Sequence, residues 1–285
     1  MLVQDVVTQT RWRDVPVWEV RTPQCVARIS CFGGQLLSWQ PAGQQEVLWC
    51  SAQLQAPRPL RGGVPLCWPW FGKHPHDPAA PSHGMARTAQ WQLDRAQLML
   101  DGRVWMRLSP QQRLHPHLQV DQQLWLGTEL EQVVTSHNVG DVPEPLTQAL
   151  HTYLQVADVA RVSVAGVQAA SYLDALQARR CLRQQGPWRF DPAVHAGRAD
   201  RIYQNVAGPV VLDDPLLSRR IQITASGGTD LVLWTPGPEL AMQMADVGAQ
   251  WSHYLCLEVG NVAADARLLL PGQSHRLQQH IALLP

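Results

Sequence analysis

The chain has 285 residues, of which 45% are hydrophobic and 16% charged, and its formal net charge at pH 7 is +0. This neutral balance gives no electrostatic reason for the chain to bind nucleic acid or an anionic membrane surface. No stretch is apolar for long enough to span a bilayer, and the first residues lack the basic and apolar regions of a signal peptide. Six cysteines without a C-x-x-C pair suit a reducing compartment, so we expect a cytoplasmic protein.

Short apolar runs between turn residues predict β-strands along most of the chain. Residues 16–32 predict a hairpin that turns near Pro23. Further strands are predicted at residues 36–39, 47–50, 118–126, 130–138, 146–156, 210–212, 221–225, 231–234, 240–244, 254–259 and 264–270. The apolar spacing within 172–185 suits a short helix. Because no linker or repeat divides the chain, we expect one all-β domain over residues 1–285, built from large antiparallel sheets packed face to face.

The segment Arg61-Gly-Gly-Val-Pro-Leu-Cys-Trp-Pro-Trp-Phe-Gly72 is the most informative part of the chain, together with Pro81-Ser-His-Gly-Met-Ala-Arg87. Repeated Gly and Pro residues rule out a regular helix and predict loops. Aromatic faces surrounded by polar donors suit a sugar ring, and paired guanidinium groups suit a phosphate. We therefore expect these loops to hold a ligand.

Three polar residues elsewhere are candidates for the same site. His151 is predicted to share a strand face with Tyr153, Glu258 ends an apolar strand, and Asp200 stands next to Arg201. A carboxylate at the end of an apolar strand is costly to bury unless it is paired or functional. The alternatives are a core histidine bonded to the backbone, a rim carboxylate in water and a solvated surface ion pair.

Two histidine pairs, His74-Pro-His76 and His115-Pro-His117, raise the question of a metal site. Two imidazoles two residues apart would share a face of a strand, but the proline inside each pair disfavours a regular strand. We therefore expect loop histidines, and neither a metal nor another cofactor.

Taken together, five motifs resemble those of the glucose-6-phosphate 1-epimerases, the hexose-6-phosphate mutarotases of the aldose 1-epimerase group. They are the two loop segments, His-Thr-Tyr-Leu-x-Val from 151, Asp-Arg-x-Tyr from 200 and Cys-Leu-Glu-Val-Gly from 256. With Trp91 they occur in the family's order and span most of the chain. The chain departs from the family at Thr235, where Asn is frequent, and the residue after the strand glutamate, here Val259, also varies.

The resemblance implies a galactose-mutarotase-like β-supersandwich that interconverts the α and β anomers of a hexose 6-phosphate without a cofactor. It implies His151 as the catalytic acid and Glu258 as the base. The substrate-binding residues are then His83 in the sugar site, Asp200 on sugar hydroxyls, and Arg61 and Arg87 at the phosphate. We add Lys73, the sole lysine, as a further phosphate contact, and Trp70 or Phe71 as a stacking face for the sugar.

In this interpretation a protonated His151 donates to the ring oxygen while an ionised Glu258 takes the proton of the C1 hydroxyl. Three alternatives stay open at this stage. They are a glycoside hydrolase with Asp200 and Glu258 as a carboxylate pair, a non-catalytic sugar-phosphate sensor, and a metal-dependent cupin-type enzyme. The neutral surface and the absence of heptads suit a monomer.

Overall fold

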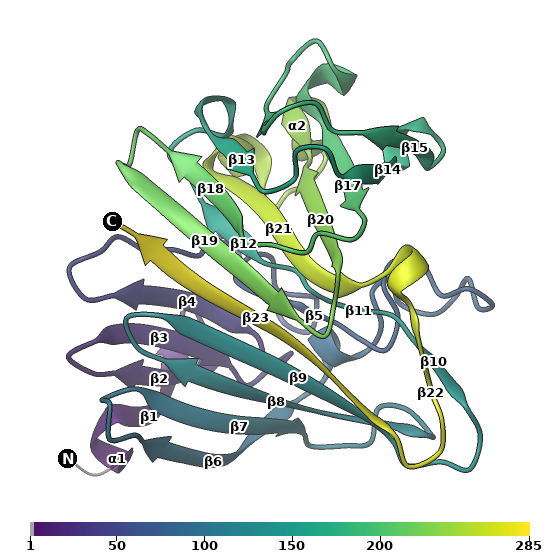
Figure 1. Ribbon diagram of the computed structural model, residues 1–285. Coiled ribbons are helices and arrows are strands. Elements are labelled where there is room, and N and C mark those ends of the chain that lie inside the picture. Colours follow the sequence, from purple (N-terminus) through teal and green to yellow (C-terminus); the bar gives the residue numbers. More distant parts are fainter. Residues whose placement is uncertain (1–2) are drawn as a thin grey trace.

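The computed structural model describes residues 3–285, in which twenty-three β-strands and two short α-helices are formed. The strands belong to antiparallel sheets of nine, eight, four and two strands, which extend across the whole molecule (Figure 1). The all-β architecture predicted from the alternating apolar runs is therefore confirmed. Residues 1 and 2 of the predicted domain lie outside the described part. No helix within residues 3–285 has the length and apolar character needed to span a membrane.

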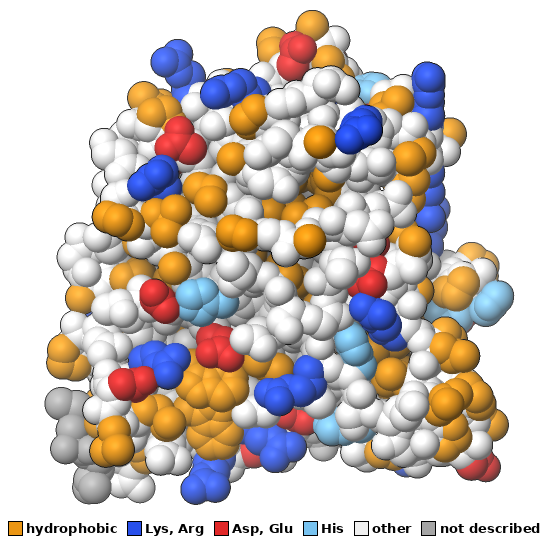
Figure 2. Space-filling view, viewed as in Figure 1, with side chains coloured by type: hydrophobic (Ala, Val, Ile, Leu, Met, Phe, Trp, Pro, Cys, Tyr) orange, Lys and Arg blue, Asp and Glu red, His pale blue; other side chains and the backbone are white. Residues whose placement is uncertain are grey.

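The nine-stranded sheet forms the face seen in Figures 1 and 2. Its strands, in spatial order, are β16 (Trp188–Arg189), β13 (Ser163–Ala165), β18 (Val210–Asp214), β19 (Arg219–Ser226), β23 (Ser274–Leu284), β9 (Leu130–Asn138), β8 (Leu118–Leu126), β7 (Val104–Pro110) and β6 (Trp91–Leu98). Strands β8 and β9 have the bounds expected from their alternation. Acidic and basic side chains are interspersed over the lower half of the outer face (Figure 2).

The eight-stranded sheet lies behind the nine-stranded one and carries the candidate residues. Its main path is β15 (Arg180–Arg183), β14 (Ser171–Asp174), β17 (Ala199–Tyr203), β20 (Asp230–Thr235), β21 (Tyr254–Asn261), β11 (Gln148–Leu150) and β5 (Leu66–Cys67), with β12 (Tyr153–Gln155) also paired to β21. One face is apolar: Leu150 and Leu257 share a buried cluster with Val134 and Leu277 of the nine-stranded sheet. Because successive side chains alternate between faces, the intervening residues point away from this core.

The remaining elements complete the periphery. They are β1 (Val7–Trp12), β2 (Val15–Arg21), β3 (Cys25–Ser30) and β4 (Leu36–Pro41) in the four-stranded sheet, β10 (Glu144–Leu146) with β22 (Arg267–Leu269), and the helices α1 (Val3–Val6) and α2 (Gly237–Ala241). The hairpin predicted at 16–32 is confirmed by the pairing of β2 with β3.

Five sequence-based assignments need correction. Of the strand expected at 264–270, only β22 forms, because the chain before it makes a 3₁₀ turn at Ala263–Asp265. The strand expected at 146–156 is divided among three elements, because Leu146 ends β10 and pairs with β22. The later break, between β11 and β12, arises because the Thr152 N–H donates to the Leu150 carbonyl oxygen 2.9 Å away and not to a neighbouring strand. The run 240–244 contains the last residues of α2 and the turn that follows it, because Pro238 at the start of α2 favours a helix. Residues 172–185 form β14, a 3₁₀ turn and β15 rather than a helix. In 47–50 only isolated bridges form, at Leu48 and Cys50.

Candidate active site

Strand pairing brings His151 and Glu258 together on the face of the eight-stranded sheet that points away from the core. Strands β11 and β12 pair with β21 in a single continuous register, and His151 lies in the short gap between them, opposite Glu258. The His151 Nδ1 atom is 3.4 Å from Glu258 Oε1. Their side chains are only 12% and 2% exposed, so the two groups face each other in a nearly dry environment.

A cavity of about 520 Å³ opens over this pair. Its walls combine cationic, acidic and aromatic side chains with a few apolar ones. They are Arg58, Pro59, Leu60, Arg61, Pro65, Phe71, Gly72, His83, Arg87, His151, Tyr153, Ala175, Arg179, Asp200, Ile202, Val232, Trp234, Asp246 and Glu258. A volume of this size fits one monosaccharide or a molecule slightly larger.

The two glycine-rich loops form one wall, and local backbone geometry sets the position of His83. His83 and Gly84 both have left-handed backbone angles, with φ of 63° and 76°. A Cβ atom on Gly84 would lie 2.0 Å from the Trp68 carbonyl oxygen, so only glycine allows the loops to approach this closely. The resulting turn directs the His83 ring toward His151, with ring centroids 5.9 Å apart.

Hydrogen bonding assigns the proton of His83 to one ring nitrogen. Its Nδ1 lies 3.3 Å from the Gly72 N–H and 3.3 Å from the Cys67 thiol, so both groups can donate to it. Burial, aided by Arg87 and Arg61, lowers the pKa of His83 to about 4. A neutral imidazole that accepts at Nδ1 carries its proton at Nε2, which makes His83 a hydrogen-bond donor for a ligand.

Burial also determines the charge states of the central pair. It raises the pKa of Glu258 well above its usual range, and the nearby Asp200 raises it further. Burial lowers the pKa of His151 well below 6.5, and His83, Arg87 and Arg61 act in the same direction. Within the described residues, His151 Nδ1 and Glu258 Oε2 are buried and make no hydrogen bond, although Nδ1 faces the other carboxyl oxygen at 3.4 Å.

Four arginines and three carboxyl groups line the cavity. We call the arginines the cationic wall; they are Arg58, Arg61, Arg87 and Arg179. Arg61 is already engaged, because its Nε donates to Asp246 Oδ2 at 3.0 Å and one terminal nitrogen donates to the Tyr153 hydroxyl at 3.4 Å. Arg87 donates to the Ser82 carbonyl oxygen, while its Nε is buried without a partner among the described residues. With Glu258 favoured in its protonated form, the cavity carries an excess of positive charge suited to an anionic group.

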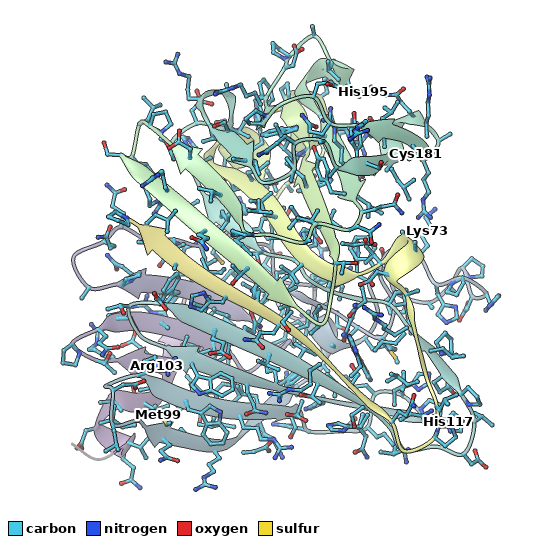
Figure 3. The ribbon with its side chains drawn as sticks, viewed as in Figure 1. Lys73, Met99, Arg103, His117, Cys181 and His195 are labelled. Carbon is cyan, nitrogen blue, oxygen red and sulfur yellow. The ribbon has the colours of Figure 1, made fainter. Side chains whose placement is uncertain are left out.

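Seven of the nine residues predicted for the site line the cavity. Lys73 and Trp70 do not. The Lys73 side chain is exposed at the periphery, as Figure 3 shows, and Trp70 Nε1 donates to the Pro81 carbonyl oxygen outside the cavity. The His83 N–H donates to the Gly72 carbonyl oxygen, which closes an outward loop that carries Lys73, and the Trp70 ring packs edge-on against His74 of this loop. No cluster of three potential metal ligands occurs within residues 3–285.

The cavity also contains residues that the sequence reasoning did not select, chiefly Trp234, Asp246 and Arg179. Trp234 could have been found as the residue at the end of a predicted strand. Asp246 and Arg179 carry no signal in the sequence, because each reaches the cavity from a turn. Thr235, the departure from the family's pattern, is buried outside the lining, and its hydroxyl has no partner in the described part of the chain.

Known proteins resemble this chain in both sequence and fold. A sequence profile of the family "Aldose 1-epimerase" matches residues 16–282. A "putative glucose-6-phosphate 1-epimerase" from Escherichia coli K12 is 30% identical over 97% of this chain and 93% of its own. A putative mutarotase from Salmonella typhimurium has a structure that aligns with a TM-score of 0.88 at 29% identity, covering 99% and 94% of the two chains. A galactose mutarotase-like protein from Clostridium acetobutylicum shares the fold, with a TM-score of 0.72 at 12% identity over 98% of both chains.

Proposed function

Because this chain belongs to the aldose 1-epimerase family, we propose that it interconverts the α and β anomers of a hexose 6-phosphate, with glucose 6-phosphate as the expected substrate. The observation that best supports the proposal is the 3.4 Å contact between His151 and Glu258 beneath an arginine-rich cavity. Anomer exchange needs one proton delivered to the ring oxygen and one removed from the C1 hydroxyl. These two oxygens are bonded to the same carbon, so an adjacent acid and base can serve both.

The proposed reaction opens and recloses the sugar ring. His151 Nε2 donates a proton to the ring oxygen while Glu258 accepts the proton of the C1 hydroxyl, and the bond between C1 and the ring oxygen breaks. The aldehyde then rotates about the bond between C1 and C2. When the ring closes, the former ring oxygen returns its proton to His151, and Glu258 returns its proton to the oxygen on C1. Each positioned proton transfer contributes about 10²- to 10⁴-fold, which is sufficient for a reaction that already proceeds in water.

The pKa shifts fit this cycle. A protonated His151 with an ionised Glu258 and a neutral His151 with a protonated Glu258 contain the same number of protons, and ring opening converts the first arrangement into the second. Burial favours the uncharged arrangement in the free site. Moving one proton across the 3.4 Å contact would prepare His151 to donate, so no net proton needs to enter from solvent.

The phosphate would lie against the cationic wall, and the sugar ring would lie between the other residues that line the cavity. Arg87 offers a buried, unpartnered Nε, and Arg61 retains donors beyond those used on Asp246 and Tyr153. At the sugar end, Phe71 presents an aromatic side chain, and Asp200 presents a carboxyl group whose pKa is raised by burial. Charge-assisted hydrogen bonds would thus hold the phosphate and leave the other walls to position the ring.

Saturation-transfer NMR of glucose 6-phosphate anomers tests the proposal. The wild-type protein should exchange the anomers well above the buffer rate, and His151→Ala should lose about 10²-fold or more of that rate. His280→Ala, which removes a partly exposed histidine that contacts Glu129 and does not line the cavity, is the matched control. Binding without exchange would instead identify a sensor, and release of reducing sugar from an aryl glycoside would identify a hydrolase.

A further inference from the structure

The imidazole of His151 is stacked on a tyrosine ring that is itself held in place. The rings of His151 and Tyr153 are 4.8 Å apart and only 8° from parallel. Tyr153 is 2% exposed, and its ring also packs against Tyr254 at 5.1 Å and Trp49 at 5.9 Å. A close-packed cluster of this kind leaves the tyrosine ring little freedom to tilt. The plane of the proposed proton donor is therefore set by its neighbour.

The hydroxyl end of Tyr153 is connected to the cationic wall. Arg61 donates to the Tyr153 hydroxyl oxygen at 3.4 Å and to Asp246 at 3.0 Å. Arg61 and Asp246 are each 31% exposed at the side chain, and both line the cavity. Asp246, Arg61, Tyr153 and His151 thus form a continuous chain of contacts from the proposed phosphate site to the proposed acid.

We propose that Tyr153 is a positioning residue, which aligns the His151 imidazole and, through Arg61 held by Asp246, couples phosphate binding to that alignment. This inference rests on the proposed function. The direction of His151 Nε2 depends on the plane of the ring, and a misplacement of about 1 Å can cost 10²-fold in rate. Binding energy from the non-reacting phosphate would then raise kcat for phosphorylated sugars in addition to lowering KM.

Two substitutions of Tyr153 separate its contact with the His151 ring from its contact with Arg61. Tyr153→Phe keeps the ring on His151 and removes the hydroxyl that Arg61 contacts, whereas Tyr153→Leu removes the stacked ring. Tyr172→Phe is the matched control, because Tyr172 packs beneath Arg201 outside the cavity. Rates for glucose 6-phosphate and glucose would be measured against concentration by saturation-transfer NMR.

We expect Tyr153→Leu to lower kcat for both sugars by about tenfold or more, with KM changed less than about threefold. Tyr153→Phe should lower the ratio of kcat for glucose 6-phosphate to kcat for glucose by about 3- to 10-fold, which is the effect of one lost hydrogen bond. The control should leave this ratio unchanged. A Leu variant that changes only KM, or a Phe variant that keeps the wild-type ratio, would overturn the inference.

A second position keeps the test valid if Tyr153→Leu does not fold. Asp246→Asn should lower the same kcat ratio, because it weakens the contact that orients Arg61, and Glu239→Gln on the exposed face of α2 is its control. An unchanged ratio in Asp246→Asn would also overturn the inference. A wild-type protein inactive on both sugars would refute the proposed function itself, which is a separate outcome.

Discussion

Replacing Glu258 by Gln should remove activity while making the fold less sensitive to pH. The change preserves the volume of a side chain that is 2% exposed, so the packing around it should survive. Glutamine cannot accept and return the sugar proton, and the expected loss in kcat/KM is about 10²- to 10⁴-fold, or about 3 to 5 kcal/mol in activation free energy. Because His151 and Glu258 exchange one proton, the double variant His151→Ala/Glu258→Gln should lose little more than either single variant.

The stability effect of Glu258→Gln follows from the raised pKa of the carboxyl group. Glu258 has a folded-state pKa well above the value of 4.5 that an unfolded chain gives it. The folded state therefore binds the proton more tightly, and wild-type stability falls as the pH rises from 4.5 toward the folded-state pKa. The variant lacks this fall, so its free energy of unfolding relative to wild type should rise by up to about 1.4 kcal/mol per pH unit over that window.

Urea denaturation at several pH values, together with saturation-transfer NMR, measures both effects on one protein sample. The expected result is a folded variant with little anomer exchange and a relative stability that increases with pH. Wild-type exchange in the variant would refute the catalytic assignment. A stability difference that stays constant from pH 4.5 to neutrality would refute the argument that burial raises the pKa of the carboxyl group.

Three further outcomes are expected. Arg87→Ala should raise KM for glucose 6-phosphate about 10- to 100-fold and affect glucose far less, since charged hydrogen bonds contribute about 1.5–3 kcal/mol; equal losses would exclude a phosphate role. Asp200→Asn should move the alkaline limb of the pH–rate profile to lower pH, because Asp200 raises the pKa of Glu258; an unmoved limb would count against that coupling. Burial raises the pKa of Asp230 from 3.8 to about 6, so this carboxyl group lowers wild-type stability as the pH rises across that interval, and Asp230→Asn should make the decline in thermal melts shallower; an unchanged slope would refute the shift.

Alternation of apolar and polar residues was sufficient to predict the class of fold and the bounds of β8 and β9. This pattern gave wrong strand bounds where backbone N–H groups bond to partners other than a neighbouring strand. The strand at 146–156 kept its expected faces, with Leu150 and Leu154 buried in the core, but it broke at Thr152. Helix α2, whose end occupies part of the strand expected at 240–244, followed from Pro238, a local signal that the apolar pattern concealed.

The sequence by itself determined which residue types could carry the chemistry, because the motifs around His151, Glu258 and Arg87 are contiguous and specific. Only the tertiary structure decided which of them meet. Asp246 lies 185 positions after Arg61, and Lys73 lies beside the glycine-rich loop without entering the cavity. Strand register and loop direction are set by packing over the whole chain, and spacing along one segment carries no information about them.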